Sequence, residues 1–156
     1  MKLAEALAQR SDAARKLEQL RSRISDNATF QEGEIPAEDP ATLLREADAT
    51  VTTLEGLMRR INQTNAIATL DGGVTLTAAI ARRDALRMRH STLVKAADAA
   101  SRAGAHGWGR QLRSELMTVS ALDVPALRGQ ADAVAQELRA LDLKLQEANW
   151  KVELAE

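Results

Sequence analysis

The chain of 156 residues has no cysteine and no tyrosine, and its only aromatic side chains are Phe30, Trp108 and Trp150. The absence of cysteine excludes disulfide bonds, thiolate metal sites and a cysteine nucleophile, and it fits a reducing compartment. With so few aromatic side chains, the core must consist of Leu, Ala, Val and Ile. The aromatic residues lie in or beside segments that we expect to be non-helical, so they are candidates to anchor loops or ends onto the protein or onto a second subunit.

Charge of one sign does not dominate either, because 21 basic residues nearly balance 22 acidic ones. A field that would steer nucleic acid or an anionic membrane towards the protein is therefore missing. No run of apolar residues approaches the ~20 that a membrane-spanning helix needs. The first residues interleave apolar and charged side chains as a helix does, unlike a signal peptide. We predict a cytoplasmic protein without nucleic-acid or membrane partners.

The strongest pattern that is present lies near the C-terminal end, where apolar residues recur at alternating spacings of four and three. This alternation is typical of a coiled-coil contact stripe and predicts a long helix, with Asp123 as its cap. Its central leucines are candidate contacts between subunits. The stripe consists of Leu127, Ala131, Val134, Leu138, Leu141, Leu145, Ala148 and Val152.

Three further helices are expected. The first extends from near Met1 to about Asn27, and Gly33 and Pro36 interrupt the pattern after it. Asp39 followed by Pro40 marks the start of the second helix, because proline lacks the N–H that would be unpaired there. A third helix starts after Thr75 or Thr77 and reaches about Arg102.

The second helix carries its own stripe at the same spacings, and one more step along it reaches Asn65. Asparagine at such a position lowers stability and fixes the register of the packed helices. Together with Asn62 it could instead bind unpaired carbonyls at the helix end or join a hydrogen-bond layer between chains. The apolar members of this stripe are Ala47, Val51, Leu54, Met58 and Ile61.

The third helix places two polar side chains, Arg83 and His90, on a stripe that also contains Ala79, Leu86, Leu93 and Ala97. A histidine there could titrate near neutral pH or belong to a buried polar layer, and the alternative is an edge residue with a structural role. The other histidine, His106, lies in a glycine-rich segment. No ligand spacing typical of a metal site is present, so we predict neither metal nor cofactor.

Two short segments alternate as β-strands do. One surrounds the turn Asp71-Gly72-Gly73 and predicts a small hairpin or a tight loop between helices. The other, Met117–Ala121, predicts a short β-ribbon.

Together these patterns predict an all-α, mainly helical fold: long antiparallel helical hairpins or a coiled coil, with one or two short β-ribbons, in a single domain over residues 1–156. Alanine-rich stripes favour close pairing between chains, so we expect a homo-oligomer. No phosphate-binding glycine loop and no nucleophile motif occurs, which argues against an enzyme. The candidate contact and polar-layer positions are Asn62, Asn65, Arg83, His90, Leu138, Leu141, Leu145 and Trp150.

Three further blocks of the sequence carry a resemblance. They are residues 31–40, residues 61–86 with Asn62, Asp71 and Arg83, and residues 146–150, which end in Trp150. Together they resemble a family of small helical bacterial proteins, some of which are labelled septicolysin. The resemblance implies a ring-like homo-oligomer, such as a hexamer, and the label implies pore formation. Two alternatives to plain self-assembly stay open: a pore-forming toxin, and a helical hairpin that binds nucleic acid through basic residues of the third helix. Those basic residues are Arg82, Arg83, Arg87, Arg89 and Lys95.

Overall fold

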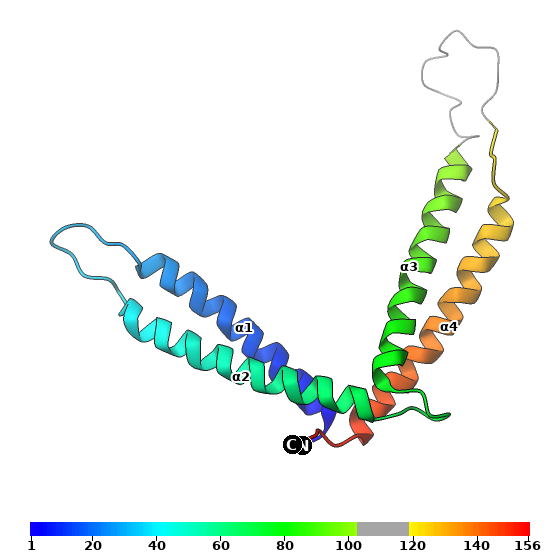
Figure 1. Ribbon diagram of the computed structural model, residues 1–156. Helices are drawn as coiled ribbons and strands as arrows, with labels where there is room; N and C mark the ends of the chain where they lie inside the picture. Colours follow the sequence, from blue (N-terminus) through cyan, green and yellow to red (C-terminus); the bar gives the residue numbers. More distant parts are fainter. Residues whose placement is uncertain (103–118) are drawn as a thin grey trace, which may run out of the picture. The chain divides into compact units, whose positions relative to one another are not determined.

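The computed structural model describes residues 1–102 and 119–156. These residues form helices α1 (Leu3–Asn27), α2 (Pro40–Ile67), α3 (Leu76–Ser101) and α4 (Val124–Lys151) (Figure 1). Within the described ranges no strand forms, so the prediction of a mainly helical fold is confirmed. The predicted ribbon at Met117–Ala121 begins outside the described residues, and residues 119–121 are not a strand. None of the described helices is both long and apolar enough to span a membrane.

The chain divides into two compact units. The first comprises Met1–Thr77 together with Gln146–Glu156, and the second comprises Ala78–Leu145. The first unit therefore contains α1, α2 and the C-terminal segment, and the second contains most of α3 and α4. The single domain expected from the length of the chain stays a prediction.

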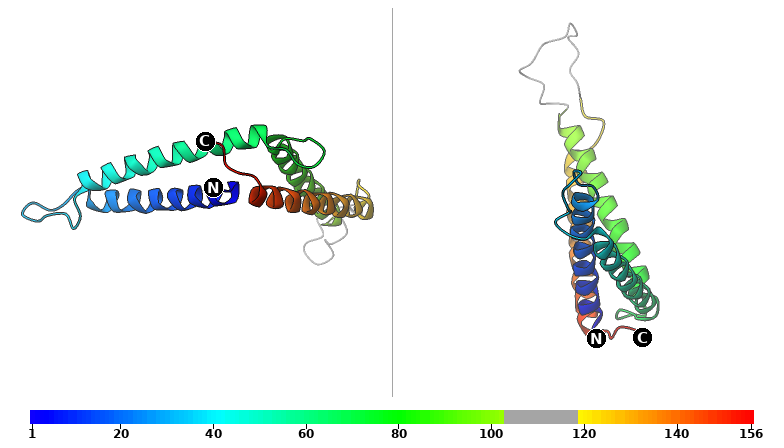
Figure 2. Two further views of the ribbon diagram at one scale, coloured as in Figure 1. Left: turned by 90° about the horizontal axis from the view of Figure 1, so that it is seen from below. Right: turned by 90° about the vertical axis from the view of Figure 1, so that its left-hand side faces the viewer.

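In the first unit, α1 and α2 lie side by side along their length (Figure 2). Both helices contribute a stripe of buried or half-buried residues at spacings of four and three, the pattern of two helices in contact. On α2 two members of this stripe are threonines, whose hydroxyls donate to the carbonyl four residues earlier. The buried side chains are Leu3, Ala6, Leu20 and Asn27 on α1 and Leu43, Thr50, Leu57, Ile61 and Thr64 on α2.

The contact stripe of α2 is only in part the one that the apolar residues predict, because Ala47 and Leu54 are half-buried as expected. Ile61 is buried, but Val51 and Met58 are exposed. Thr50 and Leu57 lie against α1 in their place. The error has a physical cause: each threonine hydroxyl is satisfied inside its own helix, so a buried threonine leaves no unpaired polar group.

The connection from α1 to α2 is fixed by polar contacts at both of its ends. Asn27 donates to the carbonyl of Arg23 and accepts from the Glu38 N–H, each at 2.9 Å. Arg23 pairs with Glu38 and lowers the pKa of that carboxyl. Asp39 caps α2 as predicted, by accepting from Ala41 N and Thr42 N.

The connection from α2 to α3 is a tight loop rather than a β-ribbon. Thr69 and Thr75 form a single antiparallel bridge, and Leu70 N donates to Val74 O at 2.8 Å. Gly72 and Gly73 have φ of 95° and 79°, a conformation that side chains with a Cβ rarely adopt. Because α2 ends at Ile67 and α3 begins at Leu76, the segment between them is too short for a ladder of several bridges.

In the second unit, α3 and α4 also lie side by side (Figures 1 and 2). Leu86, Ala97 and Ala131 are buried, and the other predicted stripe positions of this unit are buried or half-buried. The cap of α4 is Asp123, which accepts from Ala126 N at 3.0 Å, as predicted.

Candidate functional site

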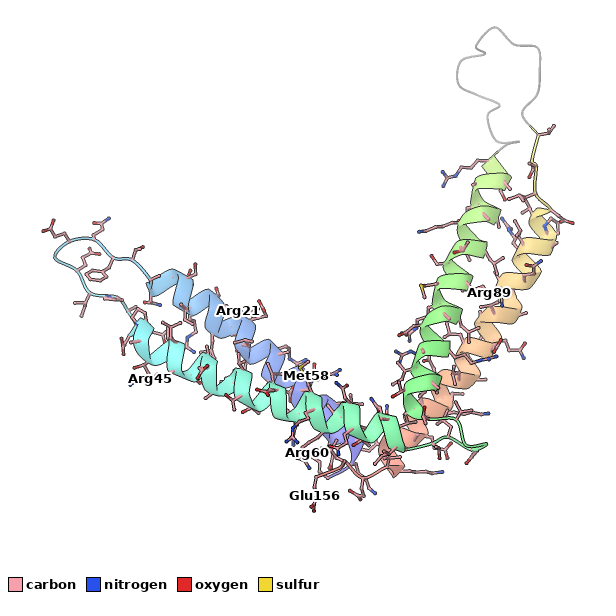
Figure 3. All side chains as sticks on the ribbon, viewed as in Figure 1. Arg21, Arg45, Met58, Arg60, Arg89 and Glu156 are labelled. Carbon is pink, nitrogen blue, oxygen red and sulfur yellow. The ribbon has the colours of Figure 1, made fainter. Side chains whose placement is uncertain are left out.

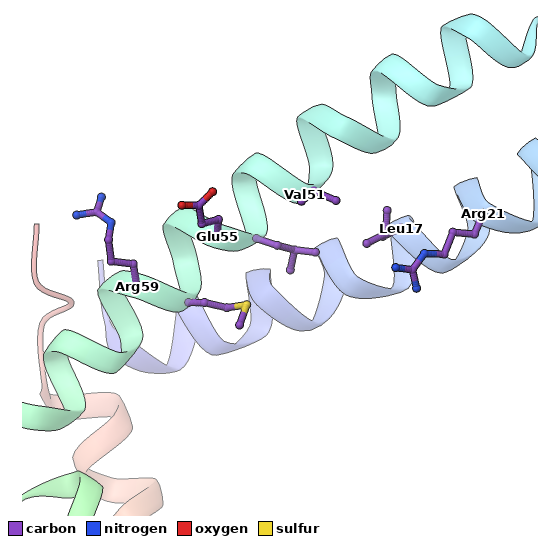
Figure 4. Close-up of a pocket in the computed structure, with 7 residues that line it drawn as sticks. Leu17, Arg21, Val51, Glu55 and Arg59 are labelled. Atoms are coloured by element: carbon purple, nitrogen blue, oxygen red, sulfur yellow. The ribbon is translucent and has the colours of Figure 1, made fainter.

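The first unit carries an apolar groove along the line where α1 and α2 meet (Figure 4). Its volume is about 450 Å³. The groove is lined by Leu17 and Arg21 from α1 and by Val51, Leu54, Glu55, Met58 and Arg59 from α2.

The floor of the groove belongs to a second apolar stripe of α2. Leu44, Val51 and Met58 follow one another at intervals of seven residues, and they are 56%, 47% and 50% exposed. A helix that packs against one partner needs an apolar stripe on one side, whereas a wider apolar face is typical of a helix that contacts more than one neighbour. The residues that α1 leaves uncovered on α2 are therefore suited to a further helix.

Opposite charges border this floor. Glu55 and Arg59 extend from the same side of α2, and Arg21 extends from α1 (Figure 4). Within the described part of the chain, Glu55 and Arg59 form no ion pair, while Arg21 pairs with Glu18 on its own helix. An apolar centre with a polar rim is typical of protein–protein contacts.

Other charges on the same hairpin are paired between the helices. Lys16 of α1 lies 2.8 Å from Glu46 of α2, and the ammonium group lowers the pKa of Glu46. Arg23 holds Glu38 in the adjoining loop. These pairs connect the two helices of the hairpin to each other, whereas Glu55 and Arg59 do not contribute to that connection.

A second feature of the first unit is the way α2 holds the C-terminal segment. Arg60 Nε donates to the carbonyl of Ala155 at 2.8 Å, and Ala155 N donates to Thr64 Oγ1 at 2.9 Å. Leu154 beside it is buried. Arg60 and Glu156 are labelled at the same end of this unit in Figure 3. Both backbone polar groups of Ala155 are therefore satisfied by side chains of α2.

The N-terminal residues hold the other edge of this segment. Leu3 N donates to Val152 O, Leu154 N donates to Met1 O, and Lys2 forms an antiparallel bridge with Glu153. Lys2 Nζ also lies 2.6 Å from the Glu153 carboxylate, and this contact is the main cause of the lowered pKa of Glu153. The segment is thus fixed on both sides, which makes it part of the core of the first unit.

The structure separates the predicted site residues into two groups. In the second unit, Arg83 and His90 lie half-buried on α3, and Leu138, Leu141 and Leu145 lie half-buried or buried on α4. In the first unit, Asn62 is exposed and Asn65 is half-buried on α2, and Trp150 is 66% exposed on α4. His106 and Trp108 lie outside the described residues.

A small cavity adjoins His90 in the second unit. Its volume is about 220 Å³, and its charged lining consists of Asp98, Arg128 and Asp132. Among the residues that the structure describes, no three His, Cys, Asp or Glu side chains are placed to hold a metal ion together. His90 therefore lies at a polar edge of the contact between α3 and α4.

Three of the five basic residues of α3 that could contact phosphate are paired with carboxylates. Arg82 pairs with Glu137, and Arg87 lies 3.5 Å from Asp142, so both connect α3 to α4. Arg83 pairs with its neighbour Asp84. A phosphate that binds these three arginines would have to displace the carboxylates, whereas Arg89 and Lys95 have no ion pair in the described residues.

The sequence interpretation missed the groove because it placed Val51 and Met58 on the one contact stripe that it predicted for α2. The sequence nevertheless contained a pattern that indicates this groove. Leu44, Val51 and Met58 share a spacing of seven residues, and Leu43, Thr50 and Leu57, each one residue earlier, share it too. Two adjacent stripes of this kind indicate a helix with two contact faces.

Comparisons with known proteins find a matching family and a similar structure, and neither has an assigned activity. The family of unknown function DUF6847 matches residues 10–154. Among solved structures, the fold is similar to that of a functionally unknown conserved protein from Corynebacterium diphtheriae, with a TM-score of 0.91 and 39% sequence identity over 99% of each chain. No curated protein matches the sequence.

Proposed function

We propose that this protein, which belongs to the family of unknown function DUF6847, is a non-enzymatic protein that assembles with copies of itself. Its function would then depend on the surface of the assembly rather than on a reactive site in one chain. The proposed contact is the apolar groove between α1 and α2.

One observation carries the proposal: the second apolar stripe of α2. Leu44, Val51 and Met58 span about 21 Å of helix at ~1.5 Å per residue and remain about half exposed. Burial of apolar surface contributes roughly 25 cal/mol per Å², so covering this stripe with a further helix stabilises an assembly. A second copy of the chain offers the same stripe, so the two stripes can cover each other.

The finer parts of the proposal come from the sequence and from the family resemblance. The sequence supports a coiled-coil type of contact between chains and a cytoplasmic location. The resemblance implies a closed ring such as a hexamer, which needs a contact between chains besides a twofold one. Trp150 supports a contact between chains, because it is 66% exposed on α4. A large aromatic side chain in that position is a frequent anchor in protein interfaces.

The test is the absolute mass of the protein by light scattering on a size-exclusion column. The wild-type chain should give a single multimer, and Val51→Glu should give a smaller species because it places an unpaired charge on the floor of the groove. Thr53→Glu is the matched control. Thr53 is an exposed β-branched residue of α2 that does not line the groove, so this variant should keep the wild-type mass.

The same run distinguishes the alternative functions. A nucleic-acid complex would raise the ratio of absorbance at 260 nm to that at 280 nm and would dissociate as the salt concentration rises, because phosphate contacts release counterions. An assembly through apolar side chains should persist in high salt. A monomeric wild-type chain would refute the proposal, and release of dye from lipid vesicles would favour the septicolysin-like, pore-forming alternative.

A further inference from the structure

We propose that two copies of the chain meet at the groove around a twofold axis, so that Glu55 of each copy pairs with Arg59 of the other. This inference rests on the proposed self-assembly and specifies how the groove recognises a second copy.

The charges of Glu55 and Arg59 are available to another chain. Glu55 and Arg59 are one helical turn apart with the acid on the N-terminal side, a spacing that often forms an ion pair within a helix. In the described part of the chain neither side chain has an ionic partner, and both line the groove. On the same hairpin, Lys16 and Glu46 pair across the helices, so those two charges are not available to another chain.

The charged edge of the groove is self-complementary. In a twofold contact the same surface serves both partners, so residue i of one copy meets residue j of the other and residue j meets residue i. A surface with charges of one sign would repel its own copy. The edge of this groove carries an acid and a base on the same side of α2 (Figure 4), so one rotation can bring both pairs of opposite charges together.

The two charges lie beside the apolar floor of the groove. Val51, Leu54 and Met58 lie next to them in the groove lining. When the floor is covered, water leaves the neighbourhood of both charges, and each then needs a partner of opposite sign. Pairing of this kind fixes the orientation of two chains more than it adds affinity.

Charge exchange tests the pairing directly. Glu55→Lys and Arg59→Glu each juxtapose like charges in the contact, so each variant alone should dissociate at a concentration at least tenfold higher than the wild type. A mixture of the two variants restores both ion pairs in the mixed assembly, so the wild-type mass should return. Glu34→Lys is the control, because Glu34 is exposed in the loop before α2 and undergoes the same change of charge.

The outcomes separate this inference from the proposed function. If Val51→Glu dissociates the multimer while both charge variants retain it, the groove is the contact and the reciprocal pairing is wrong. If both charge variants dissociate and their mixture does not recover, the pairing is also wrong. A wild-type chain that is monomeric refutes the proposed function and this inference together.

Discussion

Thr64 on α2 accepts a hydrogen bond from the backbone N–H of Ala155 at 2.9 Å and at the same time donates to the carbonyl of Arg60 at 2.8 Å. Its side chain is 1% exposed. One hydroxyl therefore satisfies a carbonyl of its own helix and an N–H near the end of the chain. The relationship explains why a threonine occupies a buried position that an aliphatic residue would otherwise fill.

Replacing this hydroxyl should destabilise the first unit. Thr64→Val keeps the shape of the side chain but leaves the partly buried Ala155 N–H without its partner, which costs about 1 kcal/mol. Urea unfolding should show a lower midpoint with an unchanged slope. Hydrogen exchange should be faster at Ala155 than in the wild-type protein.

Thr52→Val is the matched control for this change. Thr52 forms the same bond to the carbonyl four residues earlier, at 3.1 Å to Asp48 O, but it is exposed and holds no distant segment. Its free energy of unfolding should stay within about 0.5 kcal/mol of the wild type. Equal losses in both variants would show that Thr64 acts only within its helix.

The sequence predicted the helices well because their signals are local. Asp39 and Asp123 cap helices as expected, and the leucine stripe of α4 coincides with its buried and half-buried positions. The contact face of α2 was mispredicted because two adjacent stripes compete there. Apolar content alone favoured Val51 over Thr50, whereas the structure buries Thr50, whose hydroxyl bonds within the helix.

The candidate site was harder to predict than the fold for a related reason. The hydrogen bonds of Arg60 and Thr64 with Ala155 join residues more than 90 positions apart. No spacing along the chain reveals such a contact. The sequence also cannot show which charges lack a partner. Only the structure shows that Glu55 and Arg59 have no ionic partner in the residues it describes.

The leucine stripe of α4 gives a second prediction. Leu145→Asp should unfold the second unit or lower its stability by several kcal/mol, because it buries an unpaired carboxylate. Leu138→Asp and Leu141→Asp should cost less, since both leucines are half-buried. Leu143→Asp, at a position 68% exposed on the same helix, is the control and should melt like the wild type. Equal melting temperatures for all variants would refute the assignment of these leucines to the contact stripe of α4.

Asn65 gives a third prediction. Asn65→Leu should raise the melting temperature and broaden the distribution of assemblies, because a polar residue at a contact position fixes register at a cost in stability. Asn62→Leu, at an exposed position one turn earlier, should change neither. A less stable protein with a single assembly would count against Asn65 as a register device. Thermal melting and light scattering measure the two effects.

Acid should destabilise the connection between α1 and α2. The pKa of Glu38 is lowered mainly by its hydrogen bonds with Arg23, and that of Asp39 mainly by its hydrogen bond with Thr42. A carboxyl whose folded-state pKa lies below its ordinary value stabilises the fold above that ordinary value and loses the effect as the pH falls through the folded-state pKa. Stability should therefore be flat at neutral pH and fall below the ordinary values of 4.5 for Glu38 and 3.8 for Asp39.

The double variant Glu38→Gln, Asp39→Asn isolates these two groups from the other carboxylates of the chain. It should be less stable than the wild type at pH 7 and should approach it as the pH falls to about 3, because the wild-type groups are then becoming protonated as well. Glu32→Gln is the control: Glu32 is exposed in the same loop, and no ion pair holds it in the described residues. Urea midpoints measured between pH 3 and pH 7 provide the comparison. A constant difference between the double variant and the wild type over that range would mean that the cap and the ion pair act without their charge.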